Sequence, residues 1–187
     1  GYDYKNMAIL YRTNAQSRVF EESFMIKNIP YRIVGGTNFY QRKEVKDILS
    51  YLKVVDNGLD DLAVRRIINV PRRGIGAATI EKINVYAVEH NISFLDACFS
   101  ADSIDTLGNA KKKINGFADL IRDFRRKMEE GSLEELFKYI TDETGYIADL
   151  KAEETEEAEG RIENINELLN KVVAYEEVCE EHDEPVT

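Results

Sequence analysis

Apolar residues recur every three or four positions through most of the chain beyond residue 36. The clearest such face consists of Val45, Ile48, Leu49, Leu52 and Val55. This spacing predicts an amphipathic helix that ends near the Asn57-Gly58 pair. The same pattern predicts further helices over residues 80–87, 114–128 and 162–173. No convincing strand pattern interrupts them, so this part of the chain is expected to be helical and the fold class mainly α.

The first 34 residues show a different pattern. A continuous apolar run, "MAILY", covers residues 7–11 and is typical of a strand buried on both faces. A helical spacing follows over residues 18–28, and "IPYRIVGG" then indicates a second strand. Together these segments predict a βαβ unit. One such unit is too small to form a domain, so we interpret it as the edge of a larger α/β sheet and the chain as a fragment.

Polar residues mark the expected ends of several helices. Asn14 or Ser17 can cap the first helix and Asn28 can end it, while Asp60 or Asp61 can cap a later one. The pair Ser132 and Glu135 has the spacing of a capping box. Residues 146–151 are ambiguous, and the last eight residues, "EEHDEPVT", are too polar to fold by themselves.

The charge of the chain is unevenly distributed. Residues 151–187 carry a net charge of -10, which equals the charge of the whole chain, so residues 1–150 are neutral. Within that neutral part, residues 62–82 carry a local charge of +4. Binding to an anionic partner depends on the local field, and the overall acidity therefore does not exclude nucleic acid.

The stretch "VPRRGIGAATIEK", residues 70–82, concentrates this positive charge beside two glycines. Gly74 and Gly76 flank Ile75 in a turn where little side chain would keep another molecule's backbone away. The following helix points its first amides and the positive end of its dipole toward this turn, which suits a phosphate. Its further phosphate ligands are expected to be Thr79, by its hydroxyl, and Arg72, Arg73 and Lys82, by their charge.

None of these contacts reads a base, so we predict a helix-hairpin-helix arrangement that binds the duplex backbone without sequence preference. The alternative is a purely structural turn with solvated arginines. The segment "TLGNAKKKI", residues 106–114, repeats the pattern more loosely, with Gly108 followed by three lysines, and either interpretation applies there.

Arg12 and Asn14 follow the first predicted strand, where an α/β sheet presents its ligands. Arg12 can bind phosphate, and Asn14 can bond phosphate or a base edge. A helix cap at Asn14 and a surface charge at Arg12 explain the same residues equally well.

Catalytic and metal chemistry find no support in the sequence. Cys98, Cys179, His90 and His182 stand apart, without the spacing of a metal site, and no serine or cysteine has a placed base. The phosphate loop of nucleotide hydrolases is absent. No signal or membrane segment occurs, so a reduced, cytoplasmic protein without a membrane partner is expected.

Four segments together resemble the superfamily 1 DNA helicases of the UvrD and PcrA type, with the closest fit to the PcrA branch. They are "AILYRTNAQSRVFEE", "IPYRIVGGTNFYQRKEVKDILSYLKVV", "DDLAVRRIINVPRRGIGAATIEKI" and "RIENINELL". The resemblance covers nearly the whole chain, and its motifs follow the family's order and spacing. The family pattern is weakest over residues 97–113, which puts the second hairpin in doubt.

This resemblance implies an ATP-dependent motor that unwinds duplex DNA in the 3'-5' direction during replication and repair. Residues 1–34 would belong to a RecA-like motor domain (2A), and residues 35–187 to its duplex-binding helical insert (2B). ATP and Mg would bind the full-length enzyme, whereas this chain lacks the ATPase motifs and is expected to be inactive alone, without a cofactor of its own. The linker near Gly35-Gly36 would let the insert rotate.

By similarity, Arg12 and Asn14 match positions that touch the tracked single strand. Gly74, Ile75, Gly76 and Thr79 match the duplex-contacting turn, and Lys46 and Lys53 match basic positions that face the duplex. Partners would be DNA, both duplex and single-stranded, and repair or transcription proteins. The competing interpretation is a protein-interaction module that docks a basic partner on its acidic helix over residues 158–181.

Overall fold

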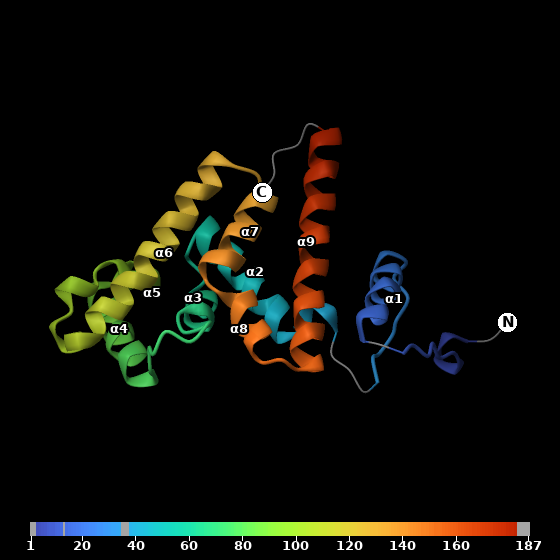
Figure 1. Cartoon of the computed structure of the whole chain (residues 1–187), viewed down its shortest axis with the longest axis horizontal. Helices are drawn as coiled ribbons and strands as arrows, with labels where there is room; N and C mark the ends of the chain where they lie inside the picture. Colours follow the sequence, from blue (N-terminus) through green and yellow to red (C-terminus); the bar gives the residue numbers. More distant parts are fainter. Residues whose placement is uncertain (1–2, 13, 35–37, 183–187) are drawn as a thin grey trace.

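The computed structural model describes residues 3–12, 14–34 and 38–182, except for the side chains of residues 14 and 15. Every regular element in these ranges is helical (Figure 1). The α-helices are α1 (Asn14–Ile26), α2 (Lys43–Asp56), α3 (Asp61–Ile67), α4 (Ala77–His90), α5 (Phe94–Phe99), α6 (Lys111–Glu130), α7 (Leu133–Glu143), α8 (Tyr146–Ala152) and α9 (Glu156–His182). Short 3-10 turns are η1 (Tyr4–Asn6), η2 (Phe39–Gln41), η3 (Ala101–Ser103) and η4 (Asp105–Ala110).

The predicted βαβ unit is wrong in its strands, because only its helix, α1, is present in the described ranges. The run over residues 7–11 has no regular secondary structure, and Leu10 is 96% exposed. Val34, in the second predicted strand, is 78% exposed. A strand is stabilised by hydrogen bonds to a neighbouring strand, and neither segment has such a neighbour. An apolar run therefore does not form a strand without the rest of its sheet.

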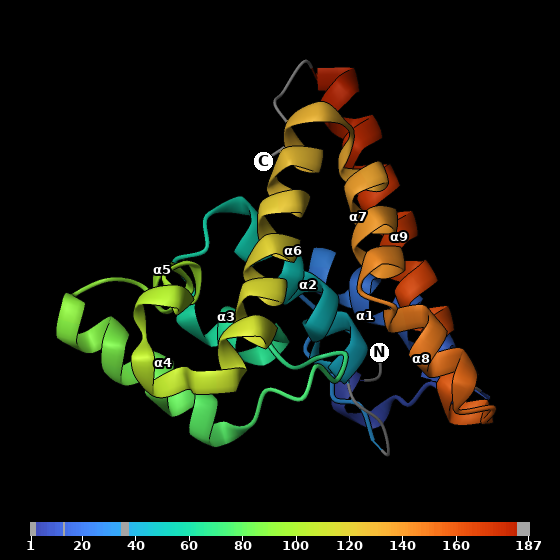
Figure 2. The ribbon, with the colours of Figure 1, turned by 60° about the vertical axis from the view of Figure 1, so that its left-hand side comes forward.

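Two hydrophobic clusters hold the helical part together, and α2 contributes to both. The larger cluster packs α2 against α3, α4, α5 and α6, with Tyr51, Phe94, Phe117 and Phe124 almost fully buried. The smaller one packs the other side of α2 against α7, α8 and α9 around Phe137 and Ile165. Figure 2 shows the resulting arrangement, in which α3–α5 gather around the start of α6 and α7–α9 lie on the other side of α2.

The predicted helices occur, and polar residues define several of their ends. The Asp60 side chain accepts hydrogen bonds from the amides of the first turn of α3, and Ser132 accepts one from the amide of Glu135. Asn28, two residues after the last residue of α1, has a positive φ of 51°. The ambiguous segment over residues 146–151 is helix α8, and residues 180–182 complete α9, whereas residues 183–187 lie outside the described ranges.

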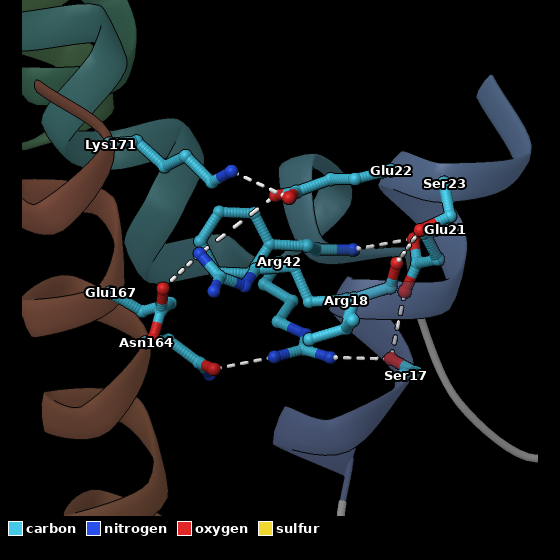
Figure 3. A network of polar contacts seen from close by, with 11 residues as sticks. Ser17, Arg18, Glu21, Glu22, Ser23, Arg42, Asn164, Glu167 and Lys171 are labelled. Carbon is cyan, nitrogen blue, oxygen red and sulfur yellow. Dashed lines mark hydrogen bonds and ion pairs between the residues drawn. The ribbon is translucent and has the colours of Figure 1, made fainter. Parts of the chain in front are cut away.

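A polar seam joins α1 to α9 and to the start of α2 (Figure 3). Lys171 on α9 donates to Glu22 on α1 at 2.5 Å, and Arg18 pairs with Glu167. Arg42 bridges the two sides, with one nitrogen 2.5 Å from Asn164 Oδ1 and another 3.3 Å from Ser17 Oγ. The seam fixes α1 beside α9 through charge and hydrogen bonds. The linker proposed near Gly35-Gly36 lies outside the described residues.

Candidate nucleic-acid interface

The glycine-rich turn, residues 68–76, connects α3 to α4 and is anchored by Ile75, the residue between its two glycines. Ile75 is 2% exposed and belongs to the larger hydrophobic cluster. Gly74 and Gly76 on either side of it are exposed. Gly74 has a φ of +69°, which side chains other than that of glycine rarely allow. The turn therefore directs its apolar side chain inward and its bare backbone outward.

Asn69 stabilises the inner side of this turn, although the sequence did not identify it as a residue of the site. Its Oδ1 accepts a hydrogen bond from the amide of Arg73 at 2.8 Å and another from the amide of Ile75 at 3.1 Å. Asparagine commonly bonds backbone amides a few residues ahead, and it stands here shortly before a proline. That turn preference is the signal that could have identified it.

The two neighbouring arginines point in different directions. The guanidinium of Arg73 turns inward and donates to the carbonyls of Ile67 at 2.9 Å and Val70 at 3.2 Å. Its other nitrogen donates to the Tyr51 hydroxyl at 2.6 Å. Burial raises the pKa of Tyr51, and the positive charge of Arg73 partly opposes this rise. Arg73 therefore satisfies the carbonyls of the turn from within, so less of its charge is available to an external phosphate.

Arg72 is exposed, and its side chain has no polar partner within the described part of the chain. A guanidinium is always charged and suits phosphate oxygens geometrically. Since its neighbour is turned inward, Arg72 is the arginine of this turn that is free to meet a ligand.

The first turn of α4, which begins five residues after Arg72 in the sequence, presents open amides. Gly76 precedes the helix, and its carbonyl accepts from the amides of Thr79 at 3.0 Å and Ile80 at 3.1 Å. Among the described residues, no hydrogen bond uses the amides of Gly76, Ala77 or Ala78, and all three residues are exposed. The Thr79 hydroxyl lies on the same turn and is half-buried. Free amides at a helix start form an anion site because the helix dipole adds to their partial positive charge.

The loosely similar segment near Gly108 lies beside this turn. It forms η4, in which Gly108 has a φ of 51°, and then α6 begins. Lys82 Nζ donates to the carbonyl of Thr106 at 2.6 Å, and Lys113 Nζ donates to the carbonyl of Gly74 at 2.9 Å. The ammonium group of Lys82, predicted to bind phosphate, is thus held by a carbonyl of the neighbouring segment. The contact of Lys113 with the glycine-rich turn was not predicted from the sequence.

A model of the UvrD-like helicase C-terminal domain matches residues 1–185. The chain belongs to this family. The ATP-dependent DNA helicase PcrA of Staphylococcus aureus is 45% identical over 177 residues, which cover 95% of this chain and 24% of the relative. PcrA of Staphylococcus epidermidis has the same identity and coverage. The UvrD-like chain thus spans about a quarter of the length of these curated relatives.

Two further basic residues of the UvrD-like chain lie on α2. Lys53 is exposed, with its Nζ 4.0 Å from a carboxylate oxygen of Asp60, and the half-buried Lys46 has no polar side-chain partner in the described ranges. No contact of the described residues joins either side chain to the glycine-rich turn. The structure therefore places them on a neighbouring helix, where their predicted approach to the duplex stays a prediction.

The residues predicted to contact a single strand lie at the start of α1. Arg12 has an exposed side chain, and its amide donates to Oε1 of Gln16 at 2.9 Å. Asn14 is the first residue of α1, but its side chain lies outside the described residues. Their proposed contacts with DNA stay predictions.

Three of the nine glutamates of α9 in the UvrD-like chain have internal partners among the described residues. Glu176 accepts hydrogen bonds from the amides of Leu133 and Glu134 at the start of α7. Glu157 pairs with Arg161, and Glu167 pairs with Arg18. These bonds leave a smaller acidic surface for a basic partner than the sequence alone indicates.

The described ranges contain neither a reactive thiol at Cys98 nor a cluster of metal ligands. Cys98 is buried, and burial raises the pKa of its thiol to about 12, so the reactive thiolate is scarce. No group of three or more His, Cys, Asp or Glu side chains is arranged to hold a metal ion in the part of the chain that the structure describes. Nor does any described helix combine the length and apolar character needed to cross a bilayer.

Proposed function

We propose that this chain is part of an ATP-dependent 3'-5' DNA helicase and that its glycine-rich turn binds the backbone of duplex DNA. Membership of the UvrD-like helicase family supports the first half of the proposal. The relatives from the two Staphylococcus species are ATP-dependent DNA helicases, which supports the use of ATP by the whole protein. ATP and Mg would bind outside this chain, which has no phosphate loop. Replication and repair are the processes that such an enzyme would serve.

Within that protein, residues 1–34 would form part of the motor domain, and residues 35–187 its helical insert. The unpaired apolar run at residues 7–11 supports this division, because it has the composition of a buried strand without a sheet around it. The order α3, turn, α4 supports a helix-hairpin-helix function for the insert. The insert would hold the duplex while the motor draws one strand away.

The observation that carries the proposal is the group of free donors around one bare turn. Arg72 has an unpaired guanidinium, and the amides of residues 76–78 have no partner in the described ranges. An added Cβ at Gly76 would meet nothing within 4 Å, so a phosphate oxygen has room to approach the backbone. These donors suit phosphate and read no base edge, so binding would be independent of sequence.

A salt titration of duplex binding tests this proposal. Each phosphate contact that a cation makes releases a counterion and adds about 0.9 to the slope of log affinity against log salt concentration. Arg72→Ala should weaken binding similarly on unrelated duplexes and flatten this slope by about one unit. Fluorescence anisotropy with two labelled duplexes at several salt concentrations gives both quantities.

Lys138→Ala is the matched control for the loss of one positive charge. Lys138 is exposed on α7, outside the glycine-rich turn, and pairs with Glu134. The control should keep the slope of the unmodified chain. Equal effects of the two substitutions, or an unchanged slope in Arg72→Ala, would rule out the turn as the phosphate site.

The protein-interaction alternative stays a prediction, because most glutamates of α9 have no partner in the described ranges. Three of the α9 carboxylates bond partners within the chain, as described above. Docking of a basic partner on α9 would have to use carboxylates beyond these.

A further inference from the structure

Two lysines link the region of the glycine-rich turn and α4 to the region of η4 and α6. Lys113, in the first turn of α6, donates to the carbonyl of Gly74. Lys82, in α4, donates to the carbonyl of Thr106 in η4. Each of the two regions therefore donates one hydrogen bond, from a lysine ammonium group, to a backbone carbonyl of the other. In Figure 2 the chain that enters α4 runs below the start of α6, which brings the two turns together.

We infer that Lys113, assisted by Lys82, is a positioning residue that holds the glycine-rich turn in the shape required for phosphate binding. This inference rests on the proposed function of that turn. It assigns Lys113 a role through the backbone of Gly74 rather than through direct contact with DNA.

The peptide group between Gly74 and Ile75 is the point on which Lys113 acts. Its N–H donates to Asn69 Oδ1 at 3.1 Å, and its carbonyl accepts from Lys113 Nζ at 2.9 Å. Both polar ends of this peptide are thus bonded, so the peptide cannot rotate without losing a bond. The next amide along the chain is that of Gly76, the first of the free donors. Its direction depends on the orientation of the peptide before it.

The need for such a restraint follows from the glycines. Glycine has more backbone freedom than any other residue, and two of them flank Ile75. A turn that must order itself on binding loses affinity to the entropy of ordering, whereas a preformed turn does not. Lys113 also lies close over the turn, because a Cβ added at Gly74 would come within 2.8 Å of its Nζ. The restraint is therefore local to the turn that the proposal uses.

Lys112 provides a matched comparison. It is adjacent to Lys113 in the first turn of α6, is exposed and has no polar side-chain partner in the described part of the chain. Lys112→Met and Lys113→Met remove the same charge and keep a similar aliphatic side chain. Only Lys113→Met removes a bond to the glycine-rich turn.

A double-mutant cycle with Arg72→Ala separates positioning from charge. One hydrogen bond typically changes an equilibrium by about two- to tenfold. Lys113→Met should weaken duplex binding by about that factor more than Lys112→Met. It should also be non-additive with Arg72→Ala, because both changes disable the same turn, whereas Lys112→Met should be additive. Lys113→Arg should restore most of the affinity, because its guanidinium can still donate to the carbonyl.

A readout without DNA accompanies the cycle. In ¹H–¹⁵N spectra of the free chain, Lys113→Met should shift the amide signals of residues 74–78, and Lys112→Met should leave them in place. If Lys113→Met lowers the folded fraction, Lys82→Met provides the second variant, since it cuts the reciprocal bond from the other side.

The outcomes distinguish the two proposals. If Arg72→Ala leaves duplex binding unchanged, the proposed function of the turn fails, and the positioning role fails with it. If Arg72→Ala weakens binding but Lys113→Met and Lys112→Met behave alike in affinity, additivity and spectra, only the positioning role is wrong. Failure of Lys113→Arg to restore affinity would also overturn the positioning role.

Discussion

Arg72 and Arg73 are adjacent in sequence, yet the structure predicts that their removal has different consequences. Arg73→Ala removes two short hydrogen bonds to backbone carbonyls and one to the Tyr51 hydroxyl. A hydrogen bond that involves a charged group contributes about 1.5–3 kcal/mol. The Ile67 carbonyl keeps the amide of Val70 as a donor, and the Val70 carbonyl keeps the Tyr51 hydroxyl, so the losses do not add fully. We expect Arg73→Ala to lower the free energy of unfolding by about 3 kcal/mol.

Arg72→Ala, by contrast, should change the free energy of unfolding by less than about 0.5 kcal/mol, because its side chain is exposed and unpaired. Urea unfolding followed by circular dichroism measures both values. With a slope near 2 kcal/mol per molar urea, the midpoint for Arg73→Ala should fall by about 1.5 M. Arg73→Lys should lie between the wild type and Arg73→Ala, since lysine keeps the charge without the planar fork. A loss below about 1 kcal/mol in Arg73→Ala would refute the structural role of Arg73.

Three further predictions concern stability. Asp60→Ala should lower the unfolding free energy by about 1 kcal/mol through loss of the α3 cap, measured by urea unfolding, and an unchanged midpoint would contradict the cap. Asp47→Asn should cost about 3 kcal/mol in the same assay, because the buried carboxylate binds Arg66 and the Tyr146 hydroxyl, and a loss below about 1 kcal/mol would contradict this. Burial raises the pKa of Cys98 from 9.0 to about 12. The contribution of the neutral thiol to the free energy of unfolding is therefore complete below pH 9 and is lost as pH rises toward 12. Between pH 8 and pH 10, Cys98→Ala should therefore lose about 1 kcal/mol less stability than the wild type, and equal losses would contradict the shifted pKa.

Periodicity identified the helices because each buries a continuous apolar face. Val45, Ile48 and Val55 are all fully buried on α2, as their spacing predicts. The strand at residues 7–11 and the described part, residues 29–34, of the strand over "IPYRIVGG" were predicted wrongly because local composition reports only the preference for a strand. A strand also needs a hydrogen-bonded neighbouring strand, and the residues of the strand itself do not show whether that neighbour is present.

The sequence indicated the position of the candidate site but did not show which role each of its residues has. The spacing of Gly74, Gly76 and the following helix start predicted exposed backbone, which the structure shows. The local sequence does not show which of the two arginines turns inward, because aromatic rings from α2 and α6 help to set the direction of Arg73, together with the carbonyls of the turn. Arg73 lies over the rings of Tyr51 and Phe117, which come from distant parts of the chain. The bond from Lys113 to Gly74 likewise joins residues 39 positions apart.

The buried position of Ile75 has a consequence for the dynamics of the exposed backbone around it. Its side chain lies in the larger hydrophobic cluster with Tyr51 and Phe117, so the turn cannot separate from the rest of the molecule while that cluster is intact. Local opening requires few buried contacts, and this turn has a central one. Amide protons of Arg73 and Ile75 should therefore exchange with solvent only about as fast as the whole domain unfolds, even though they belong to a surface loop.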